Sequence, residues 1–144
     1  MKIRFFYDGV KFRLRSGKII KDIIKKIILK EKKIPGDLFF IITGNRRILE
    51  INREFLKHNY FTDVISFSEH DGNVINGEIY ISIDTVRENA NNYKVSLTEE
   101  VARVIIHGTL HACGYNDDSV KRKKEMTRLE NLWLKEINRA KNGL

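Results

Sequence analysis

The sequence contains one cysteine, Cys113, and one proline, Pro35, among 144 residues. A lone cysteine cannot close a disulfide within the chain, and this usage is typical of proteins from a reducing compartment, so we expect a cytoplasmic protein. The longest apolar runs, such as residues 38–42, have about five residues. A membrane-spanning helix needs roughly 20, and the first residues lack the apolar core and cleavage site of a signal peptide. We therefore predict no membrane association.

Segments that could separate two domains are also lacking in the sequence, as are internal repeats and low-complexity stretches. Hydrophobic residues make up 42% of the chain, which is enough for one sizeable core. The length also fits the usual size of one domain. The sequence therefore predicts one domain over residues 1–144.

The net charge of +8 comes from one early segment. Residues 11–33 contain ten basic and two acidic residues, whereas the rest of the chain is neutral. A concentrated positive charge favours a surface that faces a polyanion, most plausibly nucleic acid. The alternative is the solvated, lysine-rich face of an amphipathic helix. The charge count alone leaves both interpretations open.

The first half of the chain mixes strand and helix patterns. Residues 2–6 and 10–14 read as two strands joined by a hairpin turn at Asp8-Gly9. Isoleucines at helical spacing predict an amphipathic helix that starts at Ser16-Gly17 and stops at Pro35-Gly36. A short apolar strand over 37–43 and a helix over 45–57 follow.

The second half continues the mixture. Residues 64–67 and 79–83 have strand patterns, and Asp84 could cap a short helix to Asn92. Ser96 and Glu99 fit a capping box that opens a helix ending near Gly114, and Ser119 could cap a last helix. We predict an α+β fold with a small mixed sheet of about four strands and four to six helices.

Two histidines on the predicted helix before Gly114 carry the chemistry. His107 and His111 are four residues apart, so their imidazoles lie on one helix face and can reach one cation, as in the zincin metal helix. After the glycine, Asp117 could supply a third ligand, which leaves a fourth position for water and favours a catalytic zinc site. Alternatively, the histidines are core residues, or Asp117 is a helix cap and Asp118 the ligand. Cys113 falls off the histidine face and is not expected to bind the metal.

The spacing H-x-x-x-H-x-x-G-x-x-D is similar to the metzincin pattern, with one change. A zinc protease carries glutamate after the first histidine as its general base, and this chain has Gly108. Glycine offers no base, so ordinary peptidase chemistry is disfavoured.

At these residues the chain resembles the YbeY family of rRNA maturation factors. The family motif H-G-x-L-H-x-x-G-Y-D-H is matched through Tyr115, with Asn116 and Asp117 in the places of its last Asp and His. Residues 62–67 resemble the family strand T-D-V-L-S-F, and residues 77–82 resemble G-D-I-x-I-S. Further matches are Glu100, Met126 and Glu130.

This resemblance implies a zinc-dependent endoribonuclease specific for single strands, which acts in 3′-end maturation of small-subunit rRNA and in ribosome quality control. It implies one zinc per chain, held by His107, His111 and Asp117, with ribosomal RNA and the small ribosomal subunit as partners. The family arginine suggested to touch RNA is replaced by Leu56, so Arg53 or Lys57 could take over a phosphate contact.

Three acids, Asp63, Glu78 and Glu100, are candidate partners for the histidines. Two other functions stay open at this point. The chain could be a non-catalytic ribosome-assembly factor with a structural metal, or a metal-dependent hydrolase of another substrate.

Overall fold

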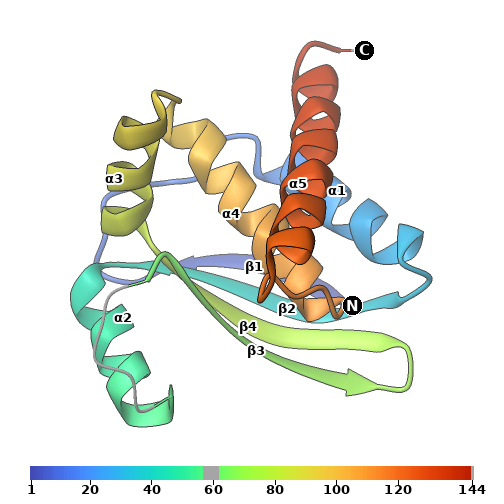
Figure 1. Cartoon of the computed structure of the whole chain (residues 1–144), viewed down its shortest axis with the longest axis horizontal. Coiled ribbons are helices and arrows are strands. Elements are labelled where there is room, and N and C mark those ends of the chain that lie inside the picture. The colour runs from blue at the N-terminus through green and yellow to red at the C-terminus, as the bar shows by residue number, and fades with distance from the viewer. Residues whose placement is uncertain (57–61, 144) are drawn as a thin grey trace.

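The computed structural model describes residues 1–56 and 62–143. Within these residues the chain forms one four-stranded sheet and five α-helices, with a short π-helix η1 (Asn52–Leu56), which confirms the predicted α+β class (Figure 1). The strands are β1 (Lys2–Tyr7), β2 (Ile34–Thr43), β3 (Val64–Asp71) and β4 (Val74–Ser82). The helices are α1 (Gly17–Lys30), α2 (Asn45–Ile51), α3 (Ile83–Tyr93), α4 (Leu97–Ala112) and α5 (Val120–Lys141).

The sheet has the order β1-β2-β4-β3. The first three strands of that order are parallel, and β3 pairs antiparallel with β4 at the edge. In Figure 1, α1, α4 and α5 lie over one face of the sheet and α2 lies against the other. The sheet and the α1, α4 and α5 layer enclose the main core, whereas Ile48 and Ile51 of α2 form a smaller cluster with Ile65 of β3.

Helix α1 confirms the isoleucine pattern. Its residues 20, 23, 24, 27 and 28 are buried, while its lysines lie outside the core. Burying one such side chain stabilises the fold by roughly 1.5–3 kcal/mol. None of the helices among the described residues is both long enough and apolar enough to span a membrane.

The predicted hairpin over residues 2–14 is wrong. Strand β1 pairs in parallel with β2, and the Asp8 N–H continues that ladder by donating to the Ile42 carbonyl over 2.9 Å. Residues 10–14 are not a strand, although their even-numbered side chains pack on the core. The segment is instead held by the Tyr7 hydroxyl, which accepts from the Leu14 N–H at 2.9 Å. The alternating pattern therefore reports burial without strand pairing.

Two local stop and cap assignments also need correction. Helix α1 ends at Lys30, and Pro35 and Gly36 lie inside β2, where the register with β4 shifts before Leu38. Helix α3 is capped by Ser82, whose hydroxyl accepts from the Thr85 N–H. The predicted cap, Asp84, instead accepts from the Asn45 N–H at the start of α2 at 2.9 Å, because these two helix starts lie side by side.

The helix predicted over 45–57 consists of two consecutive segments, because α2 is α-helical and η1, which follows it directly, is π-helical. π-helical turns are uncommon and occur often at functional sites. Lys57 lies outside the described residues. Ser96 and Ser119 cap α4 and α5 as predicted, with hydroxyls that accept from the Glu99 and Arg122 N–H groups at 3.1 Å.

Gly108 lets α4 approach the sheet closely. A Cβ atom at this position would lie only 2.9 Å from Cγ2 of the buried Ile79 on β4 and 3.7 Å from a methyl group of Val64 on β3. The missing side chain therefore points at the sheet.

We predict that Gly108→Ala lowers the free energy of unfolding by about 1 kcal/mol or more, because overpacking by about 1–3 kcal/mol outweighs the helix propensity gained. The control is Gly17→Ala at the start of α1, where a Cβ would meet nothing within 4 Å. That variant should be neutral or stabilised by up to about 1 kcal/mol. Urea denaturation of the metal-free proteins measures both, and equal midpoints for the two variants would contradict the close approach.

Candidate metal centre

The end of α4 brings the candidate ligands together. The Tyr115 N–H donates to the Leu110 carbonyl at 3.1 Å, and the Gly114 N–H donates to the His111 carbonyl at 2.9 Å. This pair of bonds is the Schellman motif, and it needs the left-handed backbone that Gly114 adopts at φ +109°. The chain thereby folds back over the last turn of α4 and carries Asp117 to the two histidines.

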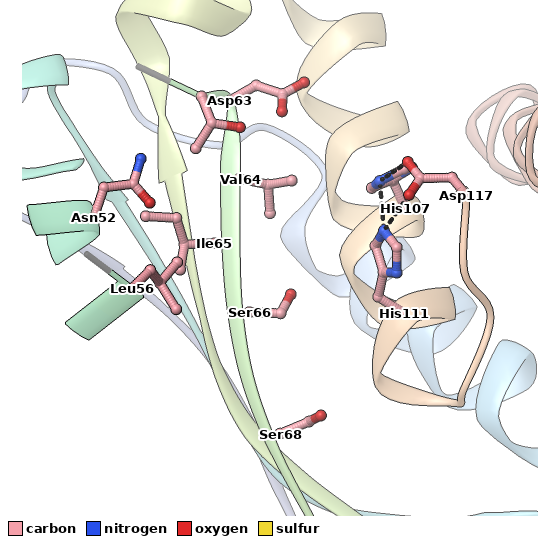
Figure 2. A pocket seen from close by; sticks show the side chains of 11 residues that line it. Asn52, Leu56, Asp63, Val64, Ile65, Ser66, Ser68, His107, His111 and Asp117 are labelled. Atoms are coloured by element: carbon pink, nitrogen blue, oxygen red, sulfur yellow. Dashed lines mark hydrogen bonds and ion pairs between the residues drawn. The ribbon is translucent and has the colours of Figure 1, made fainter. Parts of the chain in front are cut away.

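The three side chains predicted as ligands lie together at the end of α4 (Figure 2). His107 Nε2 and His111 Nε2 are 2.9 Å apart. The Asp117 carboxylate oxygens lie 3.7 Å from the first nitrogen and 3.8 Å from the second. The alternative ligand, Asp118, pairs with Arg122 at 2.8 Å instead.

Hydrogen bonds on the far side of each ring determine which nitrogen faces the centre. His107 Nδ1–H donates to Glu130 Oε2 at 2.7 Å, and His111 Nδ1–H donates to the Tyr115 carbonyl at 2.8 Å. Neither a carboxylate nor a carbonyl can donate, so both Nδ1 atoms carry the proton. Both Nε2 lone pairs are then available to one ion, which is the usual role of such outer partners.

Both outer partners are themselves held. Glu130 is buried and also accepts from Arg103 Nη1 at 3.0 Å, which compensates its charge. The Tyr115 hydroxyl donates to Glu31 Oε1 at 2.8 Å, next to the end of α1. Burial, followed by this bond and the charge of Glu31, raises the pKa of Tyr115 to about 12, so the hydroxyl keeps its proton.

The two histidines titrate in opposite directions. Burial by itself lowers the pKa of His107, but the bond to Glu130 and the charges of Glu130, Asp63 and Asp117 outweigh it and raise the pKa. Burial and the neighbouring His107 lower the pKa of His111. These directions favour His107 over His111 as the ring that carries a second proton, and the two Nε2 atoms are 2.9 Å apart, within hydrogen-bond distance. An ion that binds between them must displace this proton.

Of the three acids considered as histidine partners, none hydrogen-bonds a ring. Glu78 accepts from the Tyr80 hydroxyl at 3.0 Å, away from the histidines. Glu100 is buried beside Arg103, and burial raises its pKa. Burial also raises the pKa of Asp63, whose carboxylate accepts from Asn89 and is close enough to His107 to feel its charge.

A cavity of about 460 Å³ opens beside the three side chains. Strand β3 forms one wall, and η1 contributes Asn52 and Leu56 (Figure 2). A second cavity of about 260 Å³ adjoins it on the side of α5, and Asp63, His107 and Asp117 line both. The ligand group therefore stands at a junction that a substrate can reach.

The donor set fits a metal ion. Two imidazole nitrogens and a carboxylate oxygen within 4.8 Å of one another match the nitrogen and oxygen ligands of a catalytic zinc site. Three ligands at the wall of an open cavity also leave room for a water molecule or a substrate oxygen.

Comparison with known proteins identifies the family. The model of the family described as "Endoribonuclease YbeY" matches residues 8–138. This chain belongs to the YbeY family. The endoribonuclease YbeY of Parabacteroides distasonis is 37% identical over 131 residues, which cover 91% of this chain and 92% of that protein. The endoribonuclease YbeY of Flavobacterium psychrophilum is 44% identical over 117 residues, covering 81% and 83%.

The fold is shared as well. A solution structure of a protein from Thermotoga maritima has a TM-score of 0.64 and 30% identity, and the match covers 94% of this chain and 89% of that one. The resemblance to the YbeY family seen in the sequence is thus confirmed over most of the chain.

The remaining site residues divide into those placed at the cavity and those that are not. Leu56, which stands for the family arginine, lines the cavity. Arg53 lies in η1 with an exposed side chain, and Lys57 is outside the described residues. Their phosphate contacts stay predictions. Sequence reasoning noted Glu130 only as a family match, and its bond to His107 depends on how α5 crosses α4.

We predict that Glu130→Gln lowers the pKa of His107, because the variant keeps a hydrogen-bond acceptor but removes the charge that stabilises the imidazolium. The control is Glu136→Gln, an exposed acid on the same helix that pairs with Arg139. NMR titration of the imidazole protons in metal-free protein measures both.

The raised pKa also predicts a pH dependence. Its contribution to stability is complete below the unfolded value of about 6.5 and is lost as the pH rises through the folded pKa. Glu130→Gln should therefore reduce the difference in unfolding free energy across that window. An unchanged His107 pKa in this variant would contradict the assigned bond.

Proposed function

We propose that this chain is a zinc-dependent endoribonuclease that cuts single-stranded RNA in the 3′-end maturation of small-subunit rRNA and in ribosome quality control. One observation carries the proposal. His107, His111 and Asp117 converge at the wall of an accessible cavity, in a member of a family of endoribonucleases. We take ribosomal RNA and the small ribosomal subunit as the partners.

In this proposal the three side chains hold one zinc ion per chain. The bound ion would lower the pKa of a water molecule and polarise a phosphoryl oxygen. The chain's own groups prepare the site, since Glu130 and the Tyr115 carbonyl hold the imidazoles with Nε2 inward. The carboxylate of Asp63 lines the cavity and extends to the side of α4 (Figure 2). In its ionised form it could accept the proton of the water or 2′-hydroxyl that attacks the phosphorus, while the P–O bond to the leaving RNA oxygen breaks.

The basic segment is proposed to hold the RNA backbone. The lysines of α1 lie on the outside of the helix layer, and α1 packs against α4 and α5. Tyr115 and Glu31 join the end of α1 to the turn that carries Asp117. An RNA backbone bound along α1 would therefore run towards the metal centre. The cytoplasmic location expected from the single cysteine stays a prediction.

Gly108 argues against a peptidase for a reason beyond its lack of a base. A Cβ atom at this position would lie 2.9 Å from Cγ2 of Ile79, so a glutamate there would have to displace the sheet.

We predict that Asp117→Ala lowers zinc affinity by roughly a hundredfold or more, because it removes one of three ligands, whereas loss of an outer partner typically costs 10–100-fold. Asp118→Ala is the matched control, since the neighbouring carboxylate pairs with Arg122. Competition with a chromophoric chelator measures zinc affinity, and a single-stranded RNA substrate measures cleavage. Both readouts should fall for the first variant only.

The two results together separate the alternatives. An Asp117→Ala protein that loses zinc but still cuts RNA would contradict the zinc dependence of cleavage. An unchanged protein that binds zinc but cuts no RNA would contradict the enzyme proposal and leave the metal structural, as in an assembly factor. An Asp118→Ala protein that loses zinc would contradict the ligand assignment.

We predict that reversing two charges on α1, Lys18→Glu with Lys25→Glu, weakens binding of single-stranded RNA about tenfold at low salt. It should also reduce the salt slope by about one to two counterions, since roughly 0.7 is released per phosphate contact. The control, Arg87→Glu with Lys94→Glu, changes the net charge equally at α3, on the other side of the helix layer (Figure 1). Fluorescence anisotropy measures both, and equal losses would show that only net charge matters.

A further inference from the structure

The wall of the cavity beside the metal centre is a free sheet edge. Among the described residues, 1–56 and 62–143, β4 is the one strand that pairs with β3, so within them the other side of β3 is an edge with unpaired backbone groups. The cavity is lined by residues 62–66 in succession and by Ser68. Since side chains alternate across a strand, a run of consecutive residues lines one cavity only if the backbone edge faces it.

The antiparallel pairing shows which groups point outward. The Ser82 N–H donates to the Asp63 carbonyl at 2.9 Å, so residues 63, 65 and 67 direct their backbone groups to β4. Residues 64, 66 and 68 direct theirs away from the sheet. Among the described residues, the backbone groups of Ser66 and Ser68 have no partner from a loop or another element.

The serine side chains also extend to the metal side. Figure 2 shows Ser66 and Ser68 pointing from β3 towards the side of the cavity where His111 lies. The Ser66 hydroxyl oxygen is buried and has no hydrogen-bond partner in the part of the chain that the structure describes. Such orphan groups are uncommon in native proteins, so this hydroxyl keeps an unused capacity to donate and to accept a hydrogen bond.

We propose that the free edge of β3 at Ser66 and Ser68 is a subsite for an unpaired nucleobase of the RNA next to the scissile phosphate. This inference rests on the proposed function. The Watson–Crick edge of an unstacked base presents donors and acceptors side by side, as does the outward backbone of an edge strand. In a duplex these groups are already paired, so the subsite explains a preference for single strands.

The subsite should accept several bases, because each outward-facing residue offers both an N–H and a carbonyl. An extended polypeptide could in general pair with the same edge. RNA is the occupant favoured here because the chain belongs to a family of endoribonucleases and carries a net charge of +8.

Backbone amide exchange tests the proposal on the zinc-loaded protein. The probe is an unstructured, phosphorothioate-linked RNA of about ten nucleotides at saturation. The Ser66 and Ser68 amides should exchange about tenfold more slowly with the probe, the effect of one net hydrogen bond. The amides of Ile65 and Phe67, which point to β4, are the internal controls, and their exchange rates should stay unchanged. An RNA duplex should slow the exchange of neither serine amide.

Ser66→Ala gives a second, independent readout. Removing an orphan hydroxyl should leave the thermal unfolding midpoint unchanged or raise it, while the KM for single-stranded RNA rises about three- to tenfold. A serine with a purely structural role would give a lower midpoint and an unchanged KM, which would overturn its part in the subsite.

The outcomes distinguish the inference from the proposed function. RNA that is bound and cut without protection of Ser66 and Ser68 would overturn the subsite alone. Protection by an unstructured peptide but not by RNA would assign the edge to a polypeptide and overturn it as well. A protein that neither binds nor cuts RNA would contradict the proposed function together with the subsite.

Discussion

The turn after α4 is the constraint on which the candidate metal centre depends. Its left-handed glycine, Gly114, reverses the chain within two residues, and the same reversal has two results. It places the Tyr115 carbonyl against His111 Nδ1, and it carries Asp117 back to the His107 and His111 rings. The same loop therefore orients one candidate ligand, His111, and positions another, Asp117. A change in this turn would disturb the position of Asp117 and the orientation of His111 together.

The second support of the site is ionic and comes from α5. A buried carboxylate is costly unless it is paired, and Glu130 is paired with Arg103 and with His107. A hydrophobic residue at position 130 would avoid that cost. The candidate site explains why a glutamate stands there, since its carboxylate orients the His107 imidazole and favours the protonated form of that ring. The core of this protein thus contains a charge network that orients one of the candidate metal ligands.

Local signals in the sequence predicted much of this arrangement. Ser96 and Ser119 predicted the starts of α4 and α5 because a capping hydroxyl acts on N–H groups two or three residues away. Residues 10–14 misled because their alternation arises from packing over the core, and the true partner of β1 is β2, some 35 residues away. The hydrogen bond between His107 and Glu130 could not be predicted from the sequence either, since it depends on how α4 and α5 cross.

The close approach at Gly108 connects packing with chemistry. Glycine after the first histidine reads in the sequence as the loss of a general base. In the structure it is the point at which α4 meets Ile79 and Val64, and a side chain there would force the helix away from the sheet. That contact holds His107 and His111 beside the free edge of β3. The residue that stands in place of a peptidase base is therefore also the contact that brings the candidate metal ligands beside the edge strand β3.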